Sequence, residues 1–180
     1  MSSIDIFESR FLDDLDIISF DDDNKVPLFI DRTKNKYIDF DKKVVRYIYT
    51  IIKNGYKDFI SCVDTVIQKD NKLFLIEFKN SPRCNIKKYS LWAKAVESLA
   101  ILQRYSNIIN LKLAFVVVYN ENKKQSYKRV GKATQNIDNF PIDFGLQKYK
   151  SIIFDEVYTM NKNDFLSFKD SKFSFAKAWE

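Results

Sequence analysis

The sequence predicts a single α/β domain in which a central mixed β-sheet is flanked by helices. Two runs rich in Phe, Ile, Val and Leu, at 59–67 and 73–79, are separated by a short polar segment and predict paired strands. Apolar residues then recur at helical spacing over 91–105, and an uninterrupted apolar run follows at 111–119. Such a run is typical of a central buried strand, so we expect one sheet with the helix packed on one face.

The residues before this core predict further short elements. Residues 3–17 place apolar side chains at spacings of three and four, which indicates an amphipathic helix. The runs 26–31 and 36–41 predict two short strands joined as a hairpin. Residues 42–54 return to helical spacing, and Gly55 is suited to end that helix.

The turn between the two central runs determines how they pair. Asp70 and Asn71 occupy it, and both residue types tolerate the positive φ of a two-residue hairpin turn. A turn centred there places Asp64 opposite Glu77. Because strand side chains alternate between faces, one face of the hairpin is mostly apolar and suited to a core. This face carries Val63, Thr65, Ile67, Phe74, Ile76 and Phe78.

The opposite face of the hairpin carries Asp64, Glu77 and Lys79. Directly opposed residues have Cβ atoms about 4.5–5.5 Å apart, so the two carboxylates repel each other unless a cation lies between them. Lys79 supplies one positive charge, whereas a divalent metal supplies two. Carboxylate and carbonyl oxygens are the ligands that Mg²⁺ takes. The three residues are therefore a candidate hydrolytic metal site.

This arrangement resembles the PD-(D/E)XK nuclease superfamily, which includes many restriction endonucleases and archaeal Holliday-junction resolvases. Asp64 and, after a gap, Glu77-Phe78-Lys79 on an apolar strand match the family pattern. The order strand, strand, helix, strand is also the one that the family core needs. The resemblance covers residues 58 to about 120. Val63 stands where the name-giving Pro often sits, which is a departure from the pattern.

The resemblance implies a restriction endonuclease-like core that hydrolyses phosphodiester bonds. The implied ligands of Mg²⁺ or Mn²⁺ are Asp64, Glu77 and the backbone carbonyl of Phe78. Lys79 would orient or deprotonate a water. Glu8, on the first predicted helix, fits the place of an additional acid, and Lys94, on the helix 91–105, fits a group that points at the scissile phosphate. The alternative interpretation of Glu8 and Lys94 is an exposed helix side chain without a catalytic role.

The remaining elements complete one domain, 1–180. Apolar runs predict a further strand at 151–158 and a short helix at 163–168. We expect the core at about 58–120, with a helical and hairpin extension before it, 1–57, and a second extension after it, 121–180.

The composition excludes several kinds of site. The chain contains no His, which excludes Ser-His-Asp and Cys-His catalysis and His-ligated zinc. Its two cysteines cannot form a structural zinc site on their own, and its three glycines form no phosphate-binding glycine-rich loop. The low cysteine content and the lack of a signal-peptide pattern or an apolar membrane-spanning run lead us to expect an intracellular, cytoplasmic protein with no membrane partner.

The charge distribution favours a polyanionic partner. Residues 1–23 contain eight acids and one Arg, a net charge of −7; because the whole chain carries +6, residues 24–180 carry +13. A basic body indicates nucleic acid, and the resemblance favours DNA over RNA. Family members often act as dimers, so a homodimer is compatible. The candidate phosphate contacts are Lys87, Lys88, Lys123, Lys124, Lys128 and Arg129.

Two other functions fit the same residues. A non-catalytic nucleic-acid-binding module would keep the fold and the lysines without cutting. A small protein-interaction domain, such as a regulatory or immunity protein, would use Asp64, Glu77 and Lys79 as a structural ion-pair cluster, and its lysine-rich surface would only be solvated. The presence of all three central polar residues counts against the non-catalytic module, and we expect a metal-dependent DNA endonuclease ahead of both alternatives.

Overall fold

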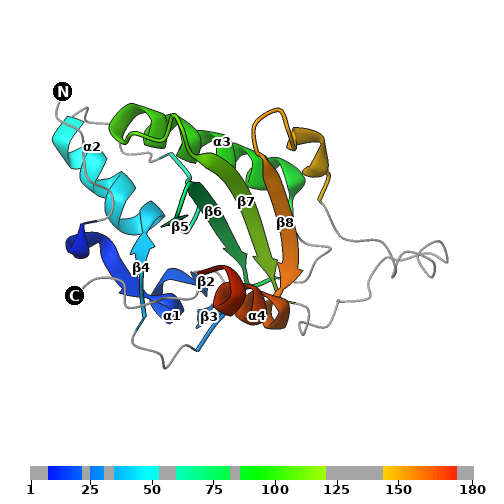
Figure 1. Cartoon of the computed structure of the whole chain (residues 1–180). Coiled ribbons are helices and arrows are strands. Elements are labelled where there is room, and N and C mark those ends of the chain that lie inside the picture. Colours follow the sequence, from blue (N-terminus) through cyan, green and yellow to red (C-terminus); the bar gives the residue numbers. More distant parts are fainter. Residues whose placement is uncertain are drawn as a thin grey trace.

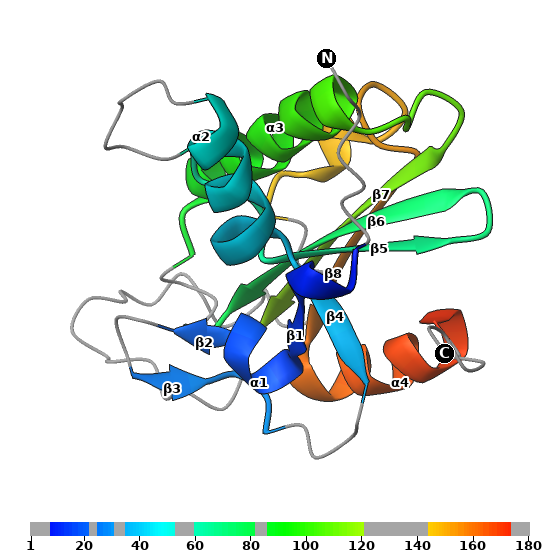
Figure 2. The ribbon, with the colours of Figure 1, turned by 90° about the vertical axis from the view of Figure 1, so that its left-hand side faces the viewer.

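The structure is a computed structural model that describes residues 8–21, 25–30, 35–52, 60–81, 86–120 and 144–173. Its centre is a six-stranded sheet with helices packed against it (Figure 1, Figure 2). In spatial order the strands are β1 (Leu12–Asp14), β4 (Lys36–Asp39), β5 (Thr65–Lys69), β6 (Lys72–Lys79), β7 (Lys112–Tyr119) and β8 (Glu156–Asn161).

The sheet is antiparallel on one side and parallel on the other. Strands β1, β4, β5 and β6 pair antiparallel in that order, whereas β6, β7 and β8 are parallel. A parallel pair needs a crossover connection, and helix α3 (Lys88–Tyr105) makes it between β6 and β7. The predicted α/β class with a mixed central sheet is therefore confirmed.

The hairpin of β5 and β6 has the predicted register. Thr65 pairs with Ile76, and Asp70 adopts a φ of 52° in the turn, which Asp tolerates better than most residues. The first strand is shorter than the predicted run 59–67, because β5 begins only at Thr65. Asp64 therefore lies just beyond the end of the ladder.

Both faces of this hairpin are covered, although the sequence indicated a core on one face only. Phe74 and Ile76 share a cluster with aromatic residues of helix α4 (Lys162–Phe173). On the opposite face, Leu75 shares a second cluster with apolar residues of α3. Because side chains alternate along β6, Glu77 also faces the α3 side.

The predicted position of Val63 on the apolar face of the hairpin is wrong. We expected it beside Phe78, but it is buried in the cluster under α3. The alternation of strand side chains does not apply to it, because the chain joins the β5–β6 ladder only at Thr65.

The helices differ in length from their predictions. Helix α3 begins at Lys88, three residues before the predicted start, and ends at Tyr105 as predicted. Helix α4 runs well past the predicted end at 168, because Phe173 is buried against the sheet. The predicted helix 42–54 is a π-helical segment, η2 (Phe40–Val45), that continues into α2 (Arg46–Ile52). Gly55 lies outside the described residues.

The predicted helix 3–17 is wrong over its described part. Residues 8–18 form a short 3₁₀ turn, η1 (Ser9–Phe11), then β1, then one turn of helix, α1 (Leu15–Ile18). The residues between these turns pair with β4 instead, and Leu12 lies opposite Ile38. Backbone pairing with β4 thus overrides the local helical pattern.

Two strand predictions also need correction. The runs 26–31 and 36–41 do not form a hairpin: β3 (Val26–Pro27) pairs with β2 (Phe20–Asp21). Pro27 has no backbone N–H to donate to a longer ladder. Strand β4 instead lies between β1 and β5 in the six-stranded sheet. The strand predicted at 151–158 begins only at Glu156, after a turn in which Ser151 has a φ of 64°. In the described part of the chain, no helix has the length and apolar character needed to cross a membrane.

Candidate active site

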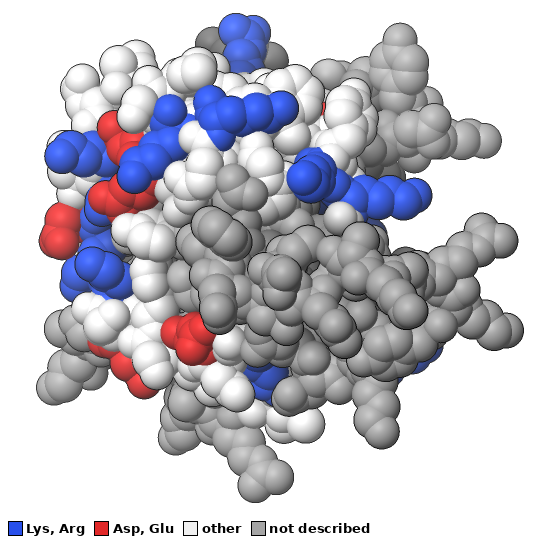
Figure 3. Space-filling view, turned by 90° about the vertical axis from the view of Figure 1, so that its right-hand side faces the viewer, with Lys and Arg blue, Asp and Glu red and all other residues white. Residues whose placement is uncertain are grey.

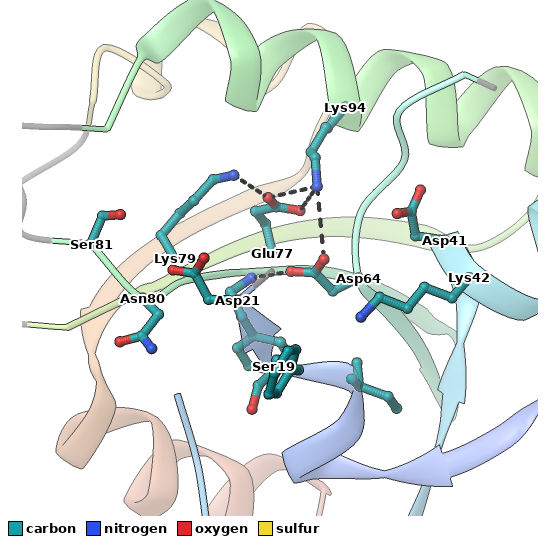
Figure 4. Close-up of a pocket in the computed structure, with 13 residues that line it drawn as sticks. Ser19, Asp21, Asp41, Lys42, Asp64, Glu77, Lys79, Asn80, Ser81 and Lys94 are labelled. Atoms are coloured by element: carbon teal, nitrogen blue, oxygen red, sulfur yellow. Dashed lines mark hydrogen bonds and ion pairs between the residues drawn. The ribbon is translucent and has the colours of Figure 1, made fainter. Parts of the chain in front are cut away.

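Four charged side chains meet at the end of β6 (Figure 4). Glu77 is at the centre: its Oε1 lies 2.7 Å from Lys79 Nζ and 2.9 Å from Lys94 Nζ. Its Oε2 accepts a hydrogen bond from Lys94 at 3.1 Å. Lys94 Nζ also lies 3.7 Å from Asp64 Oδ1. The fold therefore brings together four of the residues that the sequence singled out.

Backbone hydrogen bonds hold Asp64 on two sides. Its carbonyl oxygen accepts from the Phe40 N–H at 3.1 Å, and its Oδ2 accepts from the Phe78 N–H at 2.6 Å. In a continued ladder, the backbone of the neighbouring strand would accept from the Phe78 N–H. Because β5 starts only at Thr65, the carboxylate of Asp64 accepts instead. Asp64 Oδ1 is the oxygen nearer Lys94.

Helix α3 positions Lys94 through the neighbouring turn. Ser98 Oγ donates to the Lys94 carbonyl at 2.7 Å and accepts from the Val63 N–H at 2.9 Å. Glu97 Oε2 accepts from the Ser61 N–H at 3.0 Å. These bonds fasten α3 to the segment that leads into β5, and so fix the lysine relative to the carboxylates.

The four side chains line a pocket of about 220 Å³. Its opposite wall comes from the end of α1, from β2 and from the start of η2 (Figure 4). Three further charged residues lie in this wall: Asp21, Asp41 and Lys42. Asp41 Oδ1 accepts from the N–H of the buried Cys62 at 3.0 Å, which fixes one side of its carboxylate.

No local pattern in the sequence indicates that these wall residues belong to the site. Asp21 opens an acidic run that resembles a plain loop, and Asp41 lies at the end of the run 36–41, which we predicted as a strand. Only the tertiary packing of β2 and η2 against the end of β6 brings them to the pocket.

Burial controls the electrostatics of the pocket. The side chain of Glu77 is 0% exposed and that of Lys94 is 14% exposed. Burial and the charge of Glu77 raise the pKa of Asp64 to about 7, against the opposing effect of Lys94. Burial alone would lower the pKa of Lys94, but the charges of Glu77 and Asp64 outweigh it and raise that pKa. Lys94 therefore stays protonated at neutral pH, whereas Asp64 titrates near neutrality.

The donor atoms at this point fit a divalent cation in kind. Asp64 and Glu77 supply carboxylates. The Phe78 N–H points at Asp64, and the N–H and C=O of a strand residue point to the same edge, so the Phe78 carbonyl faces Asp64 too. The Lys94 ammonium bridges the two carboxylates, which is the place a cation between them would take. A divalent cation would therefore have to displace it.

This donor set is small. Within the described ranges, no three or more Asp, Glu, His or Cys side chains lie together as a metal-binding group. The fit consequently depends on oxygen donors besides the two carboxylates, such as the Phe78 carbonyl and water.

Other predicted site residues lie elsewhere. Glu8 does not line the pocket; its Oε2 lies 2.7 Å from Arg10 Nε, at the exposed start of η1. Lys87 and Lys88 are exposed at the start of α3, outside the pocket wall. The remaining predicted phosphate contacts, Lys123, Lys124, Lys128 and Arg129, fall outside the described residues.

Comparisons with known proteins add no family to this picture. No family model, no curated protein and no solved structure matches the chain. The chemistry of the pocket must therefore carry the argument for function.

Proposed function

We propose that the protein is a Mg²⁺- or Mn²⁺-dependent nuclease, a DNA endonuclease with a restriction endonuclease-like core. The observation that carries the proposal is the convergence of Asp64, Glu77, Lys79 and Lys94 in one pocket at the end of a central strand. Phosphodiester hydrolysis needs an oriented water and cations that stabilise the developing charge. This group of side chains can supply both.

The order of the elements supports the fold part of the proposal. The antiparallel strands β4, β5 and β6 are followed by α3 and by the parallel strand β7. That order agrees with the strand, strand, helix, strand order of the PD-(D/E)XK family. Asp64 and Glu77 lie on the hairpin segment and Lys94 on the helix, in agreement with the family pattern.

Each residue of the group has a separate task in the proposal. Asp64, Glu77 and the Phe78 carbonyl would hold the cation, and the chemistry it supplies when bound is polarisation of a phosphate and a lower pKa for a bound water. Lys79, 25% exposed, orients that water or stabilises the charge that develops on the phosphate. Lys94, once released from the carboxylates, points into the pocket and contacts the phosphate.

The charge of the molecule supports a nucleic-acid substrate. The chain carries +6 in total, and the pocket itself contains three lysines, Lys42, Lys79 and Lys94. The carboxylates of the same pocket offset these lysines, so it is the net positive charge of the whole protein that attracts polyanions and increases their rate of association.

Cleavage assays on the purified chain test the proposal. Supercoiled plasmid, single-stranded DNA and RNA are incubated with Mg²⁺, Mn²⁺ or EDTA. We expect metal-dependent nicking or linearisation of the plasmid and no cutting in EDTA. Glu77→Gln should slow cutting by about 10²-fold or more. Glu156→Gln, a matched change on β8 outside the pocket wall, should leave the rate unchanged.

A second readout separates a metal site from a structural ion-pair cluster. In a nuclease, Mn²⁺ raises the Tm of the wild type and does so less in Glu77→Gln. A wild type that cuts nothing and gains no Tm from Mn²⁺, while Glu77→Gln is destabilised, would make the chain a protein-interaction domain. Salt-sensitive DNA binding without cutting or a metal response would make it a non-catalytic binding module.

A further inference from the structure

A second surface lies at the start of α3, where the rings of Tyr89, Trp92 and Tyr149 form an aromatic row. The rings of Tyr89 and Trp92 have centroids 6.1 Å apart and planes inclined by 38°. The rings of Trp92 and Tyr149 have centroids 5.8 Å apart and planes inclined by 32°. Tyr149 belongs to a short 3₁₀ helix, η4 (Gln147–Tyr149), so the row joins α3 to the segment before β8.

The row is open to solvent at one end. Tyr89 is 77% exposed, whereas Trp92 and Tyr149 are half-buried. A ring this exposed contributes little to the core, because the hydrophobic effect depends on area removed from water. Its ordered place beside Trp92 nevertheless leaves a flat apolar face available to a ligand.

Lysines surround the row. Lys148 Nζ lies 4.9 Å from the centre of the Tyr149 ring. The Lys88 side chain runs beside Gly145, where an added Cβ would lie 3.7 Å from Nζ. Lys87 and Lys150 are exposed at the borders of the row. Figure 3 shows the face of the molecule on this side, where Lys and Arg side chains gather in the upper half.

We infer that this aromatic row is a docking surface for single-stranded nucleic acid. An unpaired base stacks on Tyr89, and the strand's phosphates contact Lys87, Lys88, Lys148 and Lys150. Aromatic rings combined with cations along the backbone suit single strands, because every base has a π-face and stacking tolerates any sequence. A duplex keeps its bases stacked on one another and so gains only the lysine contacts.

The row and the pocket share the first two turns of α3. Lys94 follows Trp92 by two residues and therefore projects roughly 200° away around the helix. A strand held by the row therefore lies across the helix from the pocket and leaves the pocket open. The row thus extends the proposed function to substrates with an unpaired segment, such as a gap, flap or junction. That extension rests on the proposed function, whereas the binding itself does not.

Binding in EDTA tests the inference without any cleavage. Labelled oligo-dT and oligo-rU of about 15 nucleotides, close to the upper site size of one binding module, are titrated with the full chain, beside a duplex of the same length. We expect one of the single strands to bind at least about 10-fold more tightly than the duplex, and its identity distinguishes DNA from RNA. Tyr89→Ala should weaken single-strand binding by about 5- to 100-fold and leave duplex binding unchanged.

Matched variants define the surface. Ile109→Ala removes another exposed apolar side chain, 88% exposed, from outside the row and should bind as the wild type does. Lys148→Ala should weaken binding and reduce the salt slope by about 1, whereas Lys112→Ala, an exposed lysine on β7, should not. Trp92→Phe should abolish most of the tryptophan quenching that accompanies binding, because the Trp92 ring lies in the row between Tyr89 and Tyr149.

Three outcomes would overturn the inference. They are equal affinity of the wild type and Tyr89→Ala for the single strand, equal affinity of the wild type for single strand and duplex, and no binding of either. The result is independent of the nuclease proposal, because Glu77→Gln should bind oligo-dT as the wild type does even if it never cuts. Loss of cutting with intact single-strand binding therefore contradicts only the proposed function.

Discussion

The two ends of β6 place the same kind of ion pair in opposite surroundings. At the start of the strand, Lys72 Nζ lies 2.6 Å from Glu156 Oε1, and the two side chains are 27% and 32% exposed. At its end, Glu77 is fully buried with ammonium groups at 2.7 and 2.9 Å. The contact distances are similar, so burial is what separates the two ends.

The pKa values of the carboxylates at the two ends are shifted in opposite directions. Hydrogen bonds from Lys72 and Tyr158 lower the pKa of Glu156, so its charged form is favoured. At the other end, burial and the charge of Glu77 raise the pKa of Asp64 to about 7. Replacing a buried ion pair by apolar residues is often neutral or stabilising, so this cluster is weak evidence for a stabilising role, and perturbed carboxylates in a pocket are typical of functional sites.

Removing the buried Lys94 ammonium should have the largest effect on stability and should distinguish the two ends of β6 most clearly. Lys94→Met leaves Glu77 buried with one less counter-charge and should lower the free energy of unfolding by about 3–5 kcal/mol. The matched change Lys72→Met should cost no more than about 1 kcal/mol, because water reaches and screens this partly exposed pair. Urea denaturation at neutral pH in EDTA measures both. Two small and equal costs would mean that water compensates Glu77 as well as it compensates Glu156.

The raised pKa of Asp64 predicts that stability falls as the pH rises. The folded chain holds this proton up to about pH 7, whereas the ordinary pKa is 3.8. Between these values the folded state binds more protons than the unfolded state, so the free energy of unfolding declines with pH, by on the order of 4 kcal/mol. Asp64→Asn keeps an oxygen for the Phe78 N–H and should remove this decline.

Urea denaturation in EDTA between about pH 4 and pH 8 tests that slope. The difference in stability between Asp64→Asn and the wild type should grow with pH and level off above neutrality. A constant difference over this range would show that Asp64 ionises at its ordinary pKa and that its surroundings are wetter than the structure indicates.

A divalent cation should take over the place of the lysine. In Lys94→Met, Mn²⁺ can bind between Asp64 and Glu77 without displacing an ammonium group. Its free energy of unfolding should therefore rise by about 2–3 kcal/mol at a 100-fold excess over Kd, and by less in the wild type. Calorimetric titration should show tighter Mn²⁺ binding to Lys94→Met than to Lys72→Met. Equal affinities would show that the ammonium does not occupy the cation's place.

The parts of this site that follow from local patterns could be predicted from the sequence. The turn at Asp70 and the alternation along β6 were enough to put Asp64 near Glu77, and the helical period put Lys94 on the right element. The contact of Lys94 with both carboxylates was not predicted, because a lysine's side chain is long and its partner is chosen by tertiary packing. From the resemblance we expected it to point at a substrate phosphate.

The failures that matter most for the site involve pairings between distant segments. Among the described residues, the apolar spacing of the predicted helix 3–17 reappears as the burial of Phe11, Leu15 and Ile18, while Leu12–Asp14 pair with β4. That change of element leaves Glu8 beside Arg10 and away from the pocket. It also accompanies the packing of β2, and hence Asp21, against the end of β6, which no local pattern encodes.

The partly exposed Lys72–Glu156 pair at the start of β6 should give the smallest effects. Because the pKa of Glu156 is lowered, its contribution is present above the ordinary pKa and is lost as the pH falls through the folded value, which is the opposite slope to that of Asp64. A double-mutant cycle of Lys72→Met and Glu156→Gln should give a coupling below about 1 kcal/mol. At about 1 M salt, where the Debye length is about 3 Å, this coupling should shrink further, whereas a cycle of Lys94→Met and Glu77→Gln should change little. A Lys72–Glu156 coupling that is larger than this and insensitive to salt would show that both ends of β6 are shielded from water, and burial would no longer explain why only one of them is a candidate site.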